Sequence, residues 1–406
     1  MTRTSWLACL SLGLGLSACT GGTLPPPPAN CTLSSNITTP TTLSPATCAT
    51  YLVSKTLEVS TALTVQPGAV LQFAANAGLQ ILETGSLNAT GTAAAPITFT
   101  GATATAGFWR GLAFRSNDPA NKLVYANILF AGSTEFCCDY FEGANQKGAV
   151  MLGGATLDSP VQVTITNTTV SRSGGYGVYL FATGTLPGFA SNTFKGNTQA
   201  PVSLPVSRIG ALDSASIYSG GTEPNTEQFV RVLEADNATN ITQTVRKLDV
   251  PYRVSAGLSG RELEYKGSLT VNAGVTLEFE ADSGLFIPDT GSLTVNGTVT
   301  EPVTFRGRLS SRGYWKGINI LSVGNTITHA TIRDAGSSVF CCAQNSDAKA
   351  GLSIGDFFSD STASVSVSNT SFTNNVFGIF NDEATGNVFT DGGGNTFSNN
   401  TTDKNF

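Results

Sequence analysis

Short apolar triplets recur every eight residues along part of this chain, and a glycine lies between successive triplets. In each triplet two apolar residues flank a polar one, which is the period-two pattern of a strand with one buried face. Three such strands with their turns would make a coil of about 24 residues, the size of a solenoid repeat. The triplets are Leu63-Thr64-Val65, Leu71-Gln72-Phe73, Leu79-Gln80-Ile81 and Leu87-Asn88-Ala89.

This stretch is present twice in the chain. Residues 63–112 align with residues 269–318 without a gap, and 23 of the 50 aligned positions are identical. An internal duplication at this level, made of short alternating strands, predicts a rod of stacked coils with one apolar column inside. The asparagine pairs Asn192/Asn197 and Asn395/Asn400 recur at matched places, so we expect their amides to stack between coils.

The repeat segments carry a family resemblance. LTVQPGAVLQF, GSLNATGTAAAPITFTG, GFWRGL and NTFKGNT resemble the right-handed parallel β-helix repeat proteins of bacterial envelopes, many of them uncharacterised lipoproteins of the pectate-lyase-like fold. The resemblance covers about residues 51–402. It agrees with the repeat pattern, and together they predict an all-β, single-stranded, right-handed parallel β-helix built from two duplicated halves.

The chain divides along these lines, and residues 201–262 have no second copy. The predicted parts are a signal peptide (1–18), a lipidated cysteine with tether and cap (19–50), a first half (51–200), joining coils (201–262), a second half (263–402) and a tail (403–406).

The first residues have the form of a secretory leader, with Arg3 before the apolar run Trp6–Leu16. Leu16-Ser17-Ala18-Cys19 resembles the bacterial lipobox, and that resemblance implies cleavage before Cys19 and lipidation of this residue. The alternative is an ordinary secretory leader. With the anchor on Cys19, the expected partner is a membrane, and the expected location is the bacterial cell envelope, at the outer membrane or cell surface.

Charge is scarce in the 406 residues: 12% are Asp, Glu, Lys or Arg, and the net charge is −6. No basic stretch exists, which argues against nucleic acid as a partner. A polysaccharide or an envelope protein is the expected partner beyond the membrane.

No catalytic constellation is visible in the sequence. Enzymes of the pectate-lyase-like fold use clustered aspartates with a base or a histidine, whereas this chain has no Asp-Asp pair and one histidine, His329. His329 aligns with Tyr125 at an expected strand position. The sequence therefore predicts no catalytic residue, no metal site and no cofactor.

Two matched aromatic–cation pairs, Trp109-Arg110 and Trp315-Lys316, are candidates for a ligand surface on which a sugar ring would stack. The alternative is a coil corner with the tryptophan packed inside and the cation outside.

Six further cysteines are candidates for disulfides in an oxidising compartment. Cys31 and Cys48 bracket a Thr/Pro-rich loop before the first coil and are expected to pair. Cys137-Cys138 and Cys341-Cys342 each follow Ala-Gly-Ser and an aromatic residue, and we expect two vicinal disulfides, with one buried and one exposed thiol per pair as the alternative.

These observations favour a non-catalytic, lipid-anchored β-helix protein of the envelope with a structural, adhesive or carbohydrate-binding role. The alternative, which rests on fold analogy, is a polysaccharide lyase or glycoside hydrolase acting on an extracellular polysaccharide.

Overall fold

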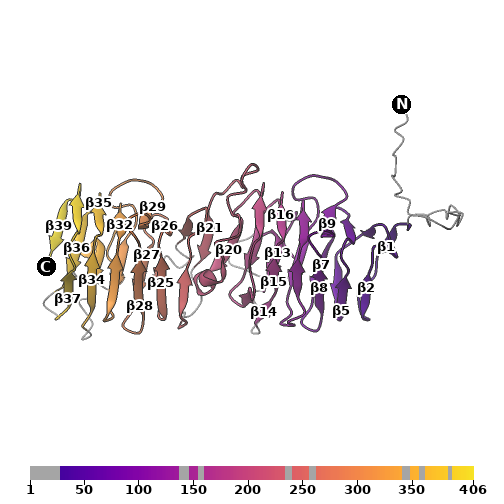
Figure 1. The fold of residues 1–406 in the computed structure, drawn as a ribbon, viewed down its shortest axis with the longest axis horizontal. Helices are drawn as coiled ribbons and strands as arrows, with labels where there is room; N and C mark the ends of the chain where they lie inside the picture. Colours follow the sequence, from indigo (N-terminus) through magenta and orange to yellow (C-terminus); the bar gives the residue numbers. More distant parts are fainter. Residues whose placement is uncertain are drawn as a thin grey trace, which may run out of the picture.

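The chain winds into an elongated rod of short strands in the computed structural model, with β1 at one end and the C-terminus at the other (Figure 1). The structure describes residues 28–136, 146–153, 160–233, 240–255, 262–340, 348–355, 362–382 and 386–406. No helix in these ranges has the length and apolar character needed to cross a membrane.

Outside the joining coils, successive strands along the chain lie in three parallel sheets, and each strand pairs with a strand one coil away. In the first half, β5 pairs with β8, β6 with β9 and β7 with β10, all in parallel register. This arrangement is a three-sided parallel β-helix and confirms the predicted fold class.

Two sheets belong to the first half of the described chain. The seven-stranded sheet contains β1 (Cys31–Leu33), β3 (Tyr51–Val53), β6 (Val70–Phe73), β9 (Ile97–Gly101), β12 (Ala126–Leu129), β16 (Thr169–Ser171) and β19 (Thr193–Lys195). The five-stranded sheet contains β2 (Thr41–Leu43), β5 (Ala62–Val65), β8 (Ser86–Thr90), β11 (Lys122–Val124) and β15 (Thr164–Thr166), and a small pair continues with β14 (Val161–Gln162) and β18 (Gly184–Thr185).

Two six-stranded sheets belong to the second half. One contains β22 (Gln243–Val245), β25 (Ser268–Asn272), β28 (Ser292–Asn296), β31 (Asn325–Thr328), β34 (Ser364–Ser368) and β37 (Val388–Asp391). The other contains β24 (Leu263–Glu264), β27 (Gly284–Ile287), β30 (Gly317–Ile320), β33 (Ala350–Ile354), β36 (Phe377–Asn381) and β39 (Thr402–Asn405).

A 13-stranded sheet runs through both halves of the described rod, and a short 3₁₀ helix, η1 (Val206–Ala211), follows its sixth strand. Its strands are β4 (Leu57–Val59), β7 (Gly78–Ile81), β10 (Gly111–Phe114), β13 (Gly148–Leu152), β17 (Tyr176–Leu180), β20 (Val202–Pro205), β21 (Val230–Leu233), β23 (Tyr252–Val254), β26 (Thr276–Phe279), β29 (Val303–Gly307), β32 (Ala330–Arg333), β35 (Ser371–Thr373) and β38 (Thr396–Ser398).

This long sheet changes its place in the repeat at the joining coils. β6 and β26 are equivalent in the duplication, yet β6 lies in the seven-stranded sheet and β26 in the 13-stranded one. Figure 1 shows the sheet passing from the middle of the rod, at β7 and β13, to its upper edge, at β26, β29 and β32. The long sheet therefore forms one face of the rod in the first half and the neighbouring face in the second half. Equivalent strands of the two halves nevertheless lie on the same side of the rod (Figure 1).

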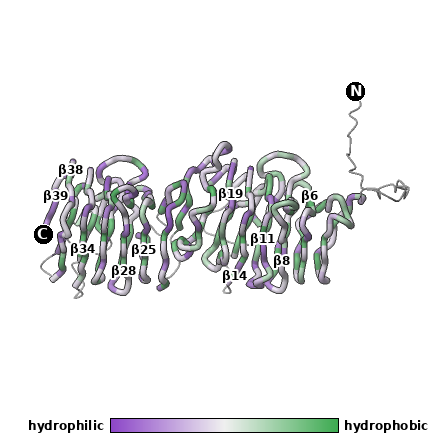
Figure 2. Tube along the Cα trace, in the orientation of Figure 1, coloured by the Kyte–Doolittle hydropathy of each residue, from purple (hydrophilic) through white to green (hydrophobic). Residues whose placement is uncertain are grey.

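The core is one continuous column of buried apolar side chains from Ile37 to Ile379. Strands such as β9 alternate buried and half-buried residues, as the period-two pattern predicts. Figure 2 shows hydrophobic residues recurring in every coil along the rod. β10, β13, β17 and β20 differ, because their outward residues are buried as well. An outer apolar cluster that includes Phe136, Met151 and Tyr179 covers that part of the long sheet.

Buried asparagines connect consecutive coils at the turns. The Asn197 Oδ1 accepts a hydrogen bond from the Ser173 backbone N–H at 3.0 Å, and its Nδ2 donates to Asn225 Oδ1 at 2.8 Å. Asn400 repeats this in the second half by accepting from the Asn375 N–H at 2.9 Å. These amides satisfy backbone groups that are buried at the corners, where an unpaired group would be costly.

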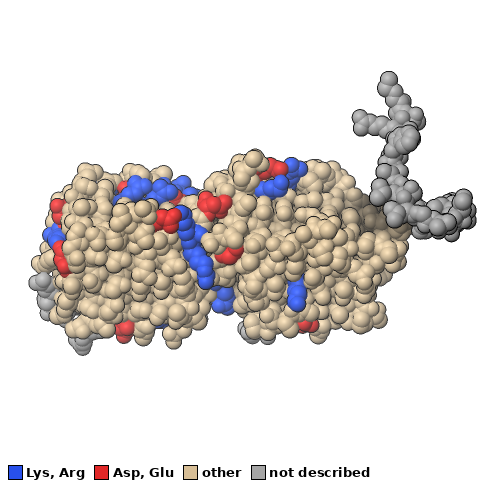
Figure 3. Space-filling view, viewed as in Figure 1, with Lys and Arg blue, Asp and Glu red and all other residues tan. Residues whose placement is uncertain are grey.

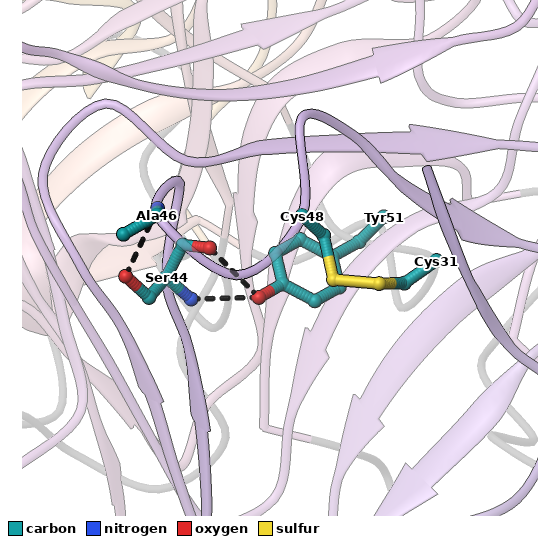
Figure 4. Close-up of a disulfide and its surroundings, with 5 residues drawn as sticks. All are labelled: Cys31, Ser44, Ala46, Cys48 and Tyr51. Carbon is teal, nitrogen blue, oxygen red and sulfur yellow. Dashed lines mark hydrogen bonds between the residues drawn. A yellow bond between two sulfur atoms is a disulfide. The ribbon is translucent and has the colours of Figure 1, made fainter. Parts of the chain in front are cut away.

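A disulfide closes the N-terminal cap. Cys31 and Cys48 are bonded, with their Cα atoms 5.7 Å apart. Beside them the Tyr51 hydroxyl donates to the Ser44 carbonyl at 2.9 Å and accepts from the Ser44 N–H at 2.7 Å (Figure 4). At the other end residues 403–405, expected to be a tail, belong to β39, which pairs with β36.

Candidate functional site

The matched tryptophans do not form a ligand surface. Trp109 and Trp315 are both fully buried. Trp109 stacks on Phe73 with ring centroids 4.0 Å apart, and its Nε1 donates to the Leu129 carbonyl at 2.7 Å. Trp315 stacks in the same way on Phe279 in the second half, with ring centroids 4.2 Å apart. Burying an indole is favourable when its N–H finds an acceptor, so both residues are core anchors of the coil corner and the ligand-surface prediction is wrong for them.

Of the cations that follow these tryptophans, Lys316 is buried, whereas Arg110 is half-buried. Lys316 is 8% exposed, and its Nζ lies 2.5 Å from Glu262 Oε1. Arg110 lies 5.5 Å from the Phe136 ring, and Lys316 lies 6.0 Å from the Phe340 ring. Lys316 is thus held by contacts within the protein, which corrects the expectation of a ligand contact for this residue, while the role expected for Arg110 stays a prediction.

The remaining predicted cysteines lie outside the described residues. They are Cys19, Cys137, Cys138, Cys341 and Cys342. Lipidation of the first and the two vicinal disulfides stay predictions.

His329 does not lie in a strand, contrary to the sequence-based expectation. It occupies the corner between β31 and β32 with φ of 48°, and Tyr125 occupies the matching corner with φ of 46°. Within the described ranges no three His, Cys, Asp or Glu residues are grouped closely enough to hold a metal ion.

A row of charged side chains on the outer face of the long sheet is the strongest candidate site. Strand pairing places one residue of each of five consecutive strands in register, from β21 to β32. We call this row the arginine ladder; its members are Arg231, Arg253, Glu278, Arg306 and Arg333. Neighbouring strands are about 4.8 Å apart, so the ladder is about 19 Å long.

Glu278 is the centre of the ladder. Arg253 donates to Glu278 Oε2 from Nη2 at 2.9 Å and from Nε at 3.1 Å, and Arg306 binds the other carboxylate oxygen. The Glu278 side chain is only 7% exposed, whereas those of Arg253 and Arg306 are 20% and 34% exposed. The carboxylate therefore lies beneath the guanidinium groups that it connects.

The two ends of the ladder are also paired with carboxylates. Arg231 forms an ion pair with Glu227 at 3.2 Å, and Arg333 forms one with the buried Asp334 at 3.3 Å. Burial raises the pKa of the Asp334 carboxyl. Asp334 is 1% exposed, while the side chain of Arg333 remains 27% exposed.

The aromatic ring of Phe229 packs beneath the first two arginines of the ladder, Arg231 and Arg253. The Arg253 guanidinium lies 3.6 Å from the centroid of the buried Phe229 ring, and Arg231 lies 5.3 Å from it. A guanidinium stacked on an aromatic face keeps its N–H edge free to donate outward. The ladder thus presents hydrogen-bond donors on four of its five strands, two on each side of Glu278.

The arginine ladder begins where the outer apolar cluster no longer covers the long sheet. The same register continues toward the N-terminus through Ser203, Tyr179 and Met151, all buried. Figure 3 shows charged side chains gathered near the middle of the rod and along the upper edge of its C-terminal half, while most of the visible surface carries none.

The ladder offers binding chemistry rather than general-base chemistry. A base must accept a proton from a bound substrate, but both oxygens of Glu278 are occupied by guanidinium groups. Asp334 is buried, and its Oδ1 accepts from Asn374 Nδ2 at 2.8 Å. Rows of Arg N–H groups match carboxylate and sulfate oxygens in charge and geometry.

The ladder was missed in the sequence because its members are 22 to 28 residues apart and become neighbours only through strand register. A signal exists all the same. In three of these strands a charged residue stands between two apolar ones, as in Val230-Arg231-Val232 and Tyr252-Arg253-Val254.

Comparison with protein-family models, with curated proteins and with solved structures found no significant match to this chain.

Proposed function

We propose that this chain is a non-catalytic, lipid-anchored β-helix protein of the bacterial cell envelope that binds an acidic polysaccharide along the arginine ladder. The family within the parallel β-helix proteins is part of this proposal and rests on the repeat segments that resemble envelope lipoproteins. The anchor rests on the lipobox-like sequence before Cys19.

The observation that carries the proposal is the register of the ladder. Four of the chain's 22 Lys and Arg residues stand on five consecutive strands, although the protein as a whole is acidic. Like charges on directly paired strands destabilise a sheet, and Arg231/Arg253 and Arg306/Arg333 are two such pairs. Glu227, Glu278 and Asp334 offset part of this cost, and an anionic ligand that bridges the four arginines would offset the rest.

The ligand chemistry follows from the geometry. Donors repeat along the rod axis and not in a closed pocket, so a linear polymer with regularly spaced anionic groups fits better than a compact ion. Exposure of about a fifth to a third of each guanidinium favours many weak, salt-sensitive contacts.

Binding to polygalacturonate and alginate, with neutral dextran as the comparison, tests the proposal on the purified chain. Replacing Arg231 and Arg306 by Gln should weaken binding to the acidic polymers by about tenfold or more, since charge-assisted hydrogen bonds are lost. The matched control replaces Arg115 and Arg172, which form exposed ion pairs in the first half, and should leave affinity unchanged.

Three outcomes would contradict the proposal. They are equal binding to dextran, an equal loss of affinity in the control, and equal affinity for duplex DNA. Release of unsaturated or reducing ends from the polymers would replace it with the enzyme alternative. Cys19→Ala tests the anchor separately: the variant should leave the membrane fraction or accumulate as uncleaved precursor.

A further inference from the structure

A polar groove lies at the corner between the β22–β25–β28 sheet and the long sheet. Its volume is about 720 Å³, within the range of small-molecule sites. It is lined by Ser214, Arg246, Lys247, Leu248, Asp249, Asn272, Ala273 and Asn296. These residues come from the joining coils and from the first coils of the second half, and none belongs to the arginine ladder.

The groove exists because turns of different length follow one another at this corner. Three residues, 273–275, connect β25 to β26, whereas the turns on either side, 246–251 and 297–302, have six each. The short turn places Ala273 between two longer turns. In Figure 3 the outline of the rod is indented beneath its middle, where the joining coils lie.

A salt bridge spans the short turn. Lys247 Nζ lies 2.6 Å from Glu301 Oε1, and the Lys247 stem crosses Gly274, where a Cβ would come within 2.7 Å of its Cδ. Gly274 also has φ of +74°, so only glycine fits there without strain. In the first half Ala95 stands at the position of Glu301, and Ala95 and Pro45 lie over the matching Gly68. The polar groove is thus a feature of the second copy.

The lining groups differ in whether they are already engaged. The Asp249 carboxylate accepts from the Tyr218 N–H at 2.9 Å, and from the Ser219 N–H and hydroxyl. By contrast, the carboxamides of the half-buried Asn272 and the exposed Asn296, in register on β25 and β28, have no hydrogen-bond partner among the described residues. Arg246 donates from Nη1 to the Gly210 carbonyl at 2.7 Å, and its other N–H groups remain available to a ligand.

We infer that this groove binds a small polyhydroxylated carboxylate, of the size and chemistry of a sugar acid. Arg246 is the cation whose donors remain for a carboxylate, because Lys247 is occupied by Glu301. The two unengaged carboxamides and the Ser214 hydroxyl both donate and accept, which suits the hydroxyl groups of such a ligand. This site is additional to the polymer-binding ladder and does not depend on it.

Calorimetric titration of the full chain with glucuronate tests the inference, with glucose and inorganic phosphate as separate probes. Glucuronate should bind at least about tenfold tighter than glucose, and Arg246→Gln should remove that difference. Asn272→Ala with Asn296→Ala should weaken both sugars. Arg308→Gln, which alters an exposed arginine paired with Glu280, should change neither.

The site is overturned if glucuronate and glucose bind alike, if neither binds at millimolar concentration, or if Arg246→Gln keeps the preference. Phosphate binding as tightly as glucuronate would assign a general anion site and would also overturn it. The ladder variant Arg231→Gln with Arg306→Gln should leave glucuronate binding intact, so failure here is distinct from failure of polymer binding.

Discussion

Replacing Glu278 by Gln should lower the stability of the rod and raise its affinity for acidic polymers. The change keeps the shape of the side chain and removes the single negative charge inside the ladder. Because Arg253 and Arg306 bind different oxygens of the carboxylate, one of them would then face the donor NH2 group of the amide.

The stability cost can be worked from the contacts. Each guanidinium–carboxylate pair is worth about 4 kcal/mol at a charge separation of about 4 Å and an effective dielectric of about 20. One hydrogen bond to Gln and the relief of burying a charge offset much of this, and broken buried pairs cost about 3–5 kcal/mol in practice. We take about 3 kcal/mol, which for a chain of this size corresponds to a fall in Tm of about 4 °C if it unfolds as one unit.

Thermal unfolding by circular dichroism measures this cost, and binding to polygalacturonate at several salt concentrations measures the affinity. Glu280→Gln is the matched control, because Glu280 and its partner Arg308 directly follow the same two strands, β26 and β29, but Glu280 is 30% exposed. An exposed pair of this kind contributes about 0–1 kcal/mol, so the control should lose little stability.

Two results would refute the reasoning. If Glu278→Gln and Glu280→Gln have the same Tm, the central carboxylate does not hold the ladder together. If Glu278→Gln folds but binds the polymer more weakly, then the carboxylate contributes to binding and the ladder does not act through its positive charge.

Three other substitutions test the frame of the rod. Asp334→Asn should raise Tm at neutral pH, because burial raises the pKa of this carboxyl and folding therefore disfavours its charged form; the gain should vanish below the pKa of an unfolded aspartate, about 3.9, where both states are protonated. Asn197→Ala should cost about 1–3 kcal/mol in chemical denaturation by leaving the Ser173 N–H without an acceptor, and an unchanged midpoint would contradict the role given to the amide. Cys48→Ser should cost about 3 kcal/mol from the loss of a 17-residue crosslink to Cys31, while added reductant should destabilise the parent but not the variant.

The coil architecture could be read from the sequence because one short pattern fixes it. A triplet such as Leu71-Gln72-Phe73 has two apolar side chains that must point inward, and the glycines allow tight turns between triplets. Repetition at eight residues then leaves stacking as the way to bury every triplet. The buried asparagines were predictable for a similar reason, since they recur at matched turns.

The candidate site was not predictable in the same way. Trp109 and Trp315 were candidates for a ligand surface because they are matched aromatics. Matched positions in a duplicated coil are, however, the ones most needed for packing, and both tryptophans are buried. The ladder depends on the joining coils, which have no second copy and shift the long sheet by one face. That shift determines which residues lie beside Arg253 on the neighbouring strands, and no pattern within a single strand predicts them.

The uninterrupted 13-stranded sheet also has a mechanical consequence. Two duplicated halves joined by a flexible linker would move independently of each other. Here the strand pairing continues through the joint, from β20 to β21, β23 and β26. A load applied along the strands would meet all their hydrogen bonds in shear. Tension along the rod axis would instead peel coils apart one at a time. The joint is therefore a continuation of the sheet and not a hinge between the two halves.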